Sequence, residues 1–417
     1  MRIAFISQQG ISDHNLWGGI NTHAKMLSGL LLKQGHFVTF FTSPESNKNK
    51  QQNPDTLELV YIDSPALKRN GKWAFRLCAT FLDIHNNTPF DCIFAEGASA
   101  WGLRPLFPAL KLPVFAFVHN FGIVHFYNTW KEVYNVRSML SYFSKTIPRI
   151  FRRTLLYDVP FLQNSRWVIS GSQFNAALLR RFYRIPRSKL RVIHNWINPN
   201  HFTPIPSLRN ETRSRLSIPQ DALTFLLVGS LWRPKGFQIA IKSFNDLLHL
   251  YPHAHLLIVG TGPLEGSLKN QAQRNIRLKR RVRFLGNFSN SKLPSIYNSA
   301  DIFLNPSLIS EVLPYVLIEA MSCGLPIIAT KLSGNSEAVG KTGLLVPPGD
   351  SKSLTDAMLF LAKHPQKRKT FSTLARKRAI ALFSEEVAEK RISSLFDLTF
   401  GTGQSSLENV EKRNQVH

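Results

Sequence analysis

The chain has 417 residues and is 43% hydrophobic, enough for two domains with large cores. Its 52 Lys and Arg against 26 Asp and Glu give a formal net charge of +26, which favours an anionic partner such as nucleic acid or a membrane surface. The three cysteines lack the spacing of a metal site or a disulfide framework, and no apolar span is long enough to cross a membrane, so we expect a reducing compartment and no transmembrane helix.

The first 41 residues predict a β-α-β unit rather than a signal peptide. An apolar strand at 2–7 is followed by a loop, a helix over 20–33 with helical spacing of its apolar residues, and a second strand at 37–41. Gly18 and Gly19 lie in the loop, where a backbone without side chains can approach a ligand closely. A glycine pair after a strand can equally mark an ordinary turn.

Two further apolar runs, 91–95 and 114–118, predict buried parallel strands. His119 follows the second run directly, and side chains just beyond the carboxyl ends of parallel strands lie at the functional edge of such a sheet. On the residues alone, His119 is either a site residue or a structural hydrogen-bonding histidine.

The stretch 133–194 is strongly basic, with 12 Lys and Arg and one acidic residue, Asp158. Its basic residues are mixed with large apolar ones, as in a helix that lies on an anionic lipid surface. Two alternatives are a solvated face and a groove for an anionic glycan. The basic residues form two clusters: Arg149, Arg152 and Arg153, and then Arg180, Arg181, Arg184, Arg187, Lys189 and Arg191.

Four prolines and many polar residues between 196 and 222 predict an interdomain linker. A second α/β domain then begins with a strand at 223–228. The loop after this strand contains Ser230, Arg233 and Lys235 and leads into a helix at Phe237. Taken alone, this loop could be no more than a basic surface turn.

The rest of the second domain continues the alternation of strands and helices. We expect strands at 255–259 and 282–285, the second followed by Gly286, helices at 352–363 and 366–398, and a loose polar tail at 400–417.

Residues 301–330 predict strand, loop, helix, turn and strand. The apolar run 302–304 is a buried strand, Pro314 suits the first turn of a helix that extends to Cys323, and Gly324 ends that helix. A loop between a parallel strand and a helix is a phosphate-binding position in α/β proteins, because free N–H groups and the helix dipole converge there.

Two carboxylates frame this loop, Glu311 before the helix and Glu319 inside it. Carboxylates accept pairs of hydrogen bonds from vicinal hydroxyls, so the combination suits a ligand that carries both phosphate and sugar. The plainer alternative is that both glutamates are solvated surface residues.

These residues resemble the signature of glycosyltransferase family 4, retaining enzymes of the GT-B fold. That family has two glutamates with seven residues between them, followed by a run close to LIEAMACGLPVVAT, and this chain has VLIEAMSCGLPIIAT. The segments GGINTHAKMLSGLLLKQGHFVTFFT, GTGP and GLLVPPGD also resemble the family. The departures are Val312 and Ser230, where glycine and arginine are usual.

The resemblance implies two Rossmann-like domains that face each other across a cleft, with a C-terminal helix that crosses back to the first domain. We expect the first domain at 1–200, the second at 201–385, and the crossing helix and tail at 386–417. It also implies that a histidine lies near the transferred sugar and that cations hold the diphosphate. The implied catalytic residues are His119, Arg233, Lys235 and Glu311, and the implied donor-binding residues are Gly18, Gly19, Ser230, Gly286, Leu313, Pro314, Tyr315, Val316 and Glu319.

The expected activity is retaining transfer of a hexose from a nucleotide-diphosphate sugar to a saccharide or lipid-linked acceptor, in cell-surface polysaccharide or glycolipid synthesis. The chain has no Asp-x-Asp triplet, so we expect no metal and no further cofactor. We expect a cytoplasmic location, free or peripheral on the inner face of the membrane. The alternatives are a nucleic-acid-binding protein, a phosphorylase or epimerase of similar architecture, and an inactive basic scaffold.

Overall fold

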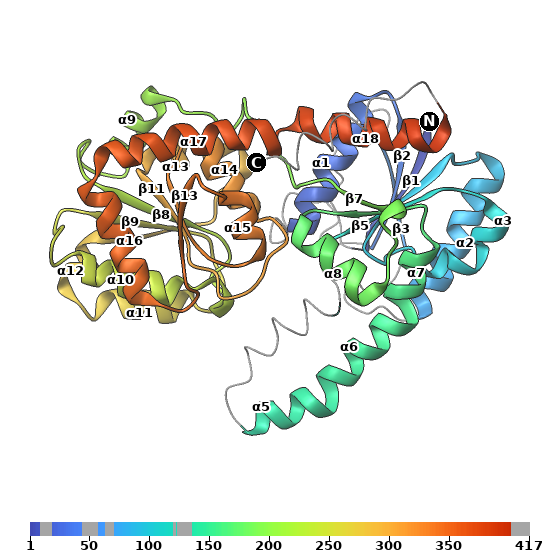
Figure 1. Ribbon diagram of the computed structural model, residues 1–417, viewed down its shortest axis with the longest axis horizontal. Coiled ribbons are helices and arrows are strands. Elements are labelled where there is room, and N and C mark those ends of the chain that lie inside the picture. Colours follow the sequence, from blue (N-terminus) through green and yellow to red (C-terminus); the bar gives the residue numbers. More distant parts are fainter. Residues whose placement is uncertain (9–18, 44–56, 63–70, 120–121, 123–135, 402–417) are drawn as a thin grey trace. The chain divides into compact units, whose positions relative to one another are not determined.

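The structure is a computed structural model that describes residues 1–8, 19–43, 57–62, 71–119, 122 and 136–401 (Figure 1). The chain forms two compact units. The first contains Met1–Ile193 and Glu386–His417, and the second contains His194–Glu385.

The first unit is built on a seven-stranded parallel sheet of order β3-β2-β1-β4-β5-β6-β7. Most of its strands are continuous apolar runs, because helices cover a parallel sheet on both faces and bury its side chains. The strands are β1 (Arg2–Ile6), β2 (Phe37–Thr42), β3 (Leu57–Tyr61), β4 (Cys92–Glu96), β5 (Val114–Val118), β6 (Trp167–Ser170) and β7 (Leu190–Val192).

The helices of the first unit include one that departs from the sheet. Residues 136–164 form a nearly continuous helical run, hereafter the projecting helix, whose first part, residues 136–153, extends away from the rest of the unit, whereas Phe161 and Leu162 near its end belong to the core (Figure 1). It consists of α5 (Val136–Ser141), α6 (Ile147–Arg153) and α7 (Val159–Asn164), joined by π-helical turns at Tyr142–Thr146 and Thr154–Asp158. The other helices are α1 (Gly19–Lys33), α2 (Gly71–Asn87), α3 (Phe107–Leu110), α8 (Gln173–Tyr183) and α18 (Glu385–Phe400).

The second unit is built on a six-stranded parallel sheet of order β10-β9-β8-β11-β12-β13. The predicted alternation of strands and helices is confirmed here. The strands are β8 (Thr224–Val228), β9 (His255–Val259), β10 (Val282–Gly286), β11 (Ile302–Asn305), β12 (Ile327–Thr330) and β13 (Gly343–Val346). The helices are α9 (Pro206–Arg215), α10 (Phe237–Leu247), α11 (Glu265–Gln273), α12 (Ile276–Arg281), α13 (Leu293–Ser299), α14 (Tyr315–Ser322), α15 (Ser333–Val339), α16 (Ser351–Lys363) and α17 (Pro365–Phe383).

The predicted linker over 196–222 is wrong, because this stretch belongs to the second unit and contains α9. Arg213 on α9 is fully buried and donates to Asp301 Oδ2 at 2.8 Å, next to the start of β11. Pro206 is compatible with this helix because it occupies the first turn, where its missing N–H has no partner to lose.

The C-terminal helix returns to the first unit, as predicted. Phe396 on α18 packs on Phe94 and Phe115 of the first sheet, with ring centroids 5.8 and 5.7 Å away. The single helix predicted over 366–398 is instead two helices, α17 and α18. They are separated at Ser384, which has an extended backbone and forms a parallel β-bridge with Ile197.

Candidate active site

The site in the second unit lies where the strand order reverses. The chain fills the sheet from β8 outward to β10 and then returns to place β11 on the other side of β8. β8 and β11 are therefore neighbours, and the loops that follow them leave the carboxyl edge of the sheet side by side in opposite directions along the strand order. Such a switch point is the usual ligand position in an open α/β sheet.

The loop after β8 presents Lys235 in a single 3-10 turn, Arg233–Lys235. Gly236 follows with φ of 74°, and a Cβ there would lie 1.9 Å from the carbonyl oxygen of Pro306. Only glycine therefore allows this loop to pack against the end of β11. This close approach brings Lys235 to the loop that contains Glu311.

Lys235 and Glu311 form an ion pair, with Nζ 2.5 Å from Oε2. Both side chains are largely covered, with 27% and 18% of their area exposed. The other carboxylate oxygen of Glu311, Oε1, is buried and has no hydrogen-bond partner among the described residues. The pair is therefore incompletely satisfied on the glutamate side, and a ligand hydroxyl could supply the missing donor.

Glu319 is in a different environment from Glu311. It is 5% exposed, and its Oε2 accepts a hydrogen bond of 2.6 Å from the hydroxyl of Tyr297 on α13. Burial raises the pKa of Glu319 to about 7, although the hydrogen bond from Tyr297 lowers it. Burial and the adjacent carboxylate raise the pKa of Tyr297 well above its usual range.

The other predicted donor-binding residues of the second unit lie in or beside these loops, except Gly286, which is at the end of the outer strand β10. Leu313 is buried, and its carbonyl oxygen accepts a hydrogen bond of 2.7 Å from Asn195. Pro314 is the N-cap residue of α14, which begins at Tyr315. Ser230 and Val316 are partly exposed, and Arg233 is exposed. Gly286 ends β10 with φ of 71°.

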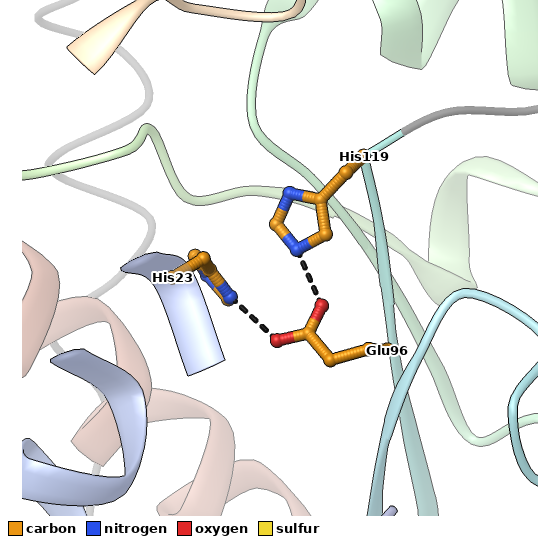
Figure 2. Close-up of side chains that lie close together, drawn as sticks. All are labelled: His23, Glu96 and His119. Carbon is orange, nitrogen blue, oxygen red and sulfur yellow. Dashed lines mark hydrogen bonds and ion pairs between the residues drawn. The ribbon is translucent and has the colours of Figure 1, made fainter. Parts of the chain in front are cut away.

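The first unit contains a second cluster of polar side chains at the carboxyl edge of its sheet. Glu96 ends β4, His119 follows β5, and His23 projects from α1, which follows β1 (Figure 2). His23 Nδ1 is 2.8 Å from Glu96 Oε1, and His119 Nε2 is 2.5 Å from Glu96 Oε2. The strand order reverses between β1 and β4, so this cluster also lies at a switch point.

The protonation states of Glu96, His23 and His119 depend strongly on one another, because the three side chains are close together and largely buried. Burial alone would raise the pKa of Glu96, but the charges of His119 and His23 and their hydrogen bonds lower it to about 2. Burial lowers the pKa of His23, despite the carboxylate beside it. Glu96 is therefore an anion at neutral pH, and His23 is biased toward its neutral form.

The same three side chains are the one group of potential metal ligands found among the described residues, with ligating atoms within 4.8 Å of one another. Two imidazoles and a carboxylate are a ligand set that Zn²⁺ accepts. Each carboxylate oxygen, however, already faces a ring nitrogen at hydrogen-bond distance, so an ion would have to displace both contacts.

Sequence reasoning identified His119 but missed Glu96, His23 and Tyr297. Glu96 had a usable signal, since an acidic residue directly after an apolar strand lies at the same edge as His119. Of the two predicted glycines, Gly19 is the first residue of α1, and Gly18 lies outside the described residues.

Family models match parts of both units. The family model described as Glycosyltransferase Family 4 matches residues 17–201, and the one described as Glycosyl transferases group 1 matches residues 222–364. The α-monoglucosyldiacylglycerol synthase of Streptococcus pneumoniae is 28% identical over 319 residues, or 75% of this chain and 67% of that protein. The UDP-Gal:α-D-GlcNAc-diphosphoundecaprenol α-1,3-galactosyltransferase of Escherichia coli is 31% identical over 176 residues, or 41% of this chain and 44% of that protein.

The fold is also shared with solved structures. Sucrose-phosphate synthase from Thermosynechococcus elongatus matches with a TM-score of 0.78 and 24% identity, covering 97% of this chain and 100% of that one. Both sheets, both switch points and the family matches lead to one assignment. The chain belongs to glycosyltransferase family 4 and has the GT-B fold, with two Rossmann-like domains on parallel sheets.

Proposed function

We propose that this protein is a retaining glycosyltransferase that moves a hexose from a nucleotide-diphosphate sugar to a saccharide or lipid-linked acceptor. The observation that carries the proposal is the Lys235–Glu311 pair at the switch point of the second sheet. One group can hold phosphate and the other can hold vicinal hydroxyls, which are the two features of a sugar nucleotide.

The diphosphate would lie between the loop after β8 and the N-terminus of α14. Lys235 and Arg233 supply fixed positive charge on one side, and the N-terminal end of α14, which follows Pro314, supplies the positive end of its helix dipole on the other. These charges stabilise the negative charge that develops on the diphosphate as the bond to the sugar breaks. Glu311 would accept hydrogen bonds from hydroxyls of the transferred sugar.

In the proposed reaction, the bond between the anomeric carbon and the phosphate oxygen breaks. The acceptor oxygen forms its bond to the same face of the sugar, which retains the anomeric configuration. The acceptor proton passes to the leaving phosphate oxygen, so the products are the glycoside and the nucleoside diphosphate. His119 would contact the transferred sugar, in keeping with the family resemblance.

The proposed transfer reaction needs no metal ion, because the cations of the loop after β8 take the place of a divalent ion. No Asp-x-Asp triplet occurs in the sequence. Activity in the presence of a chelator is therefore expected, and a requirement for Mg²⁺ or Mn²⁺ would contradict this part of the proposal.

The acceptor is proposed to be lipid-linked, and the protein to dock on an anionic membrane surface. The names of both relatives above describe lipid acceptors or products. The exposed face of the projecting helix is both apolar and basic. Leu140, Phe143 and Phe151 are 63%, 52% and 63% exposed, whereas large apolar side chains are mostly buried in folded proteins.

The apolar face continues onto the neighbouring helix α2. Phe75 is 76% exposed and lines a shallow hollow together with Leu156, Trp101 and Arg104. A second hollow, on and just after α8, is lined by Arg180, Arg181, Arg184 and Arg187. Apolar side chains with cations beside them match the chemistry of an anionic bilayer surface.

The proposed location is the cytoplasmic face of the membrane. None of the described helices is long and apolar enough to span a bilayer. The three cysteines are all free thiols, which suits a reducing compartment.

The test is a thermal-shift screen of the purified protein against nucleoside diphosphates and their sugars, followed by donor hydrolysis and transfer assays. A ligand at a hundred times its dissociation constant stabilises the fold by about 2.7 kcal/mol, which such a screen detects. We expect one nucleotide class to bind, slow hydrolysis of its sugar, and α-to-α retention in the product by NMR. Absence of nucleotide binding together with a salt-sensitive shift of duplex DNA would instead favour a nucleic-acid-binding protein.

A further inference from the structure

The buried cluster of the first unit contains more than the histidine expected from the sequence. Glu96 lies between two imidazoles, and each of its oxygens faces one ring nitrogen (Figure 2). The side chains of Glu96 and His23 are 2% and 3% exposed, and that of His119 is 11% exposed. Three separate elements, β4, α1 and the residue after β5, are needed to bring these groups together.

The chemistry of a carboxylate determines which ring nitrogens carry protons. An ionised carboxylate can only accept hydrogen bonds, so both ring nitrogens that face it must be N–H donors. His23 is therefore protonated at Nδ1, and the ion pair at the other oxygen assigns the proton of His119 to Nε2, although neither atom of that pair has a regular hydrogen-bond partner among the described residues. In the neutral ring of His119, this leaves Nδ1 as a bare acceptor, and Nδ1 lies on the side of the ring away from Glu96 (Figure 2).

We propose that Glu96 is a positioning residue that holds His119 as its Nε2–H tautomer, so that Nδ1 accepts a hydrogen bond from a sugar hydroxyl. The role of Nδ1 rests on the proposed function, whereas the tautomer does not. His23 supports the arrangement by satisfying the second carboxylate oxygen, which would otherwise be a buried acceptor without a donor.

The substitution Glu96→Gln tests this inference, because it keeps the size of the side chain and changes only its hydrogen bonding. An amide accepts through its oxygen and donates through its nitrogen. It can therefore accept from one histidine but must donate to the other, and that histidine must present a bare nitrogen. Glu96→Gln should reverse the tautomer of either His119 or His23.

The first readout is ¹⁵N NMR of histidine-labelled protein, recorded where the His119 ring is neutral. We expect the proton of wild-type His119 on Nε2, and a reversed tautomer at one of the two histidines in Glu96→Gln. A wild-type proton on Nδ1, or tautomers that are unchanged in the variant, would overturn the inference. This measurement needs no turnover, so it decides the tautomer even if the proposed transferase activity is absent.

The second readout is steady-state transfer. Where NMR shows that Glu96→Gln reverses the tautomer of His119, the variant should lower kcat by roughly tenfold or more, the loss of about one hydrogen bond, with little change in KM for the donor. Glu96→Asp keeps a carboxylate and should recover part of kcat. If the tautomer of His119 is reversed and kcat is nevertheless unchanged in the folded fraction, Glu96 has a purely structural role and the inference is overturned.

A matched control is available in the second unit. His194 Nε2 is 2.8 Å from Glu337 Oε1, a second largely buried pair of the same two residue types. Glu337→Gln should change the NMR signals of His194 but leave the signals of His119 and the rate of transfer as they are in the wild type.

Discussion

Lys235 and Glu311 are 76 positions apart in the sequence, yet their charged groups are 2.5 Å apart. In the absence of ligand, the cation proposed for the diphosphate is thus neutralised by the carboxylate proposed for the sugar. A diphosphate must compete with Glu311 for Lys235. Binding of the donor would then free Glu311 to accept hydrogen bonds from the sugar, so the two roles are coupled.

The first prediction separates these roles by calorimetry with the nucleoside diphosphate. Lys235→Ala should weaken its binding by about 1.5–3 kcal/mol, the value of a charge-assisted hydrogen bond. Glu311→Gln should bind it at least as tightly as the wild type, because the competitor of the diphosphate is gone, while turnover is lost. The control is Lys269→Ala, which breaks a similar but exposed pair with Glu265. Equal weakening in Lys235→Ala and Glu311→Gln would contradict the assignment.

The second prediction concerns His119. His119→Gln keeps an N–H donor for Glu96, so it should keep the melting temperature close to that of the wild type and still lose most transfer activity. His119→Ala leaves a carboxylate oxygen of Glu96 buried without that donor, which should lower the free energy of unfolding by about 1–3 kcal/mol. Near-normal transfer by His119→Gln would show that this histidine is only structural.

The third prediction concerns the pH dependence of stability that arises from Glu319. Its folded-state pKa of about 7 is raised above its ordinary value of 4.5, so the folded protein binds this proton more tightly than the unfolded chain. The contribution is fully present below pH 4.5 and is lost as the pH rises through 7. Glu319→Gln remains neutral, so between pH 5 and 8 the free energy of unfolding of the variant should rise relative to that of the wild type, by at most about 1.4 kcal/mol for each pH unit. Melting curves of both proteins over this pH range measure the change.

Tyr297→Phe provides a second test of the same pair. The hydrogen bond from Tyr297 lowers the pKa of Glu319, so its removal should move the loss of stability to higher pH. If the melting temperatures of wild type and Glu319→Gln change with pH in the same way, Glu319 is ionised throughout this pH range.

The fourth prediction concerns membrane docking by the projecting helix. Arg153 is left unchanged, because its Nε is 3.6 Å from the buried Asp158 and reversal would place two carboxylates together. The triple change of Lys145, Arg149 and Arg152 to Glu should reduce affinity for anionic vesicles by about a hundredfold or more, at about 1 kcal/mol for each basic residue. Sedimentation with and without anionic lipid measures this.

Docking should also weaken with salt, because the Debye length falls from about 10 Å at 0.1 M to about 3 Å at 1 M. The matched control reverses three exposed cations of the second unit, Arg274, Lys279 and Arg280, and should sediment as the wild type does. Donor hydrolysis should be normal in both variants. If the wild type ignores anionic vesicles at low salt, the basic face serves another partner, most simply an anionic saccharide acceptor.

Local patterns in the sequence were enough to predict much of the fold. Strands β5 and β9 have the predicted bounds, and α14 ends one residue before its predicted end. Continuous apolar runs identify buried parallel strands, because both faces of each strand contact helices. The helix signals are equally local, since they depend on spacing within a few turns and on glycine and proline at the ends.

The tertiary structure decided which distant polar groups meet. Prolines and polar residues over 196–222 predicted a linker, and nothing local showed that Arg213 of α9 is buried by its pairing with Asp301, 88 positions away. Glu96 and His23 had no partner that could be read from their neighbours in sequence. The order of the strands brings them to His119, and it likewise brings Lys235 to Glu311. Strand order depends on the packing of the whole sheet, which no local pattern reveals. Local periodicity therefore determined where the helices and strands lie in the sequence, and the assembled sheets determined which residues form the two charged clusters.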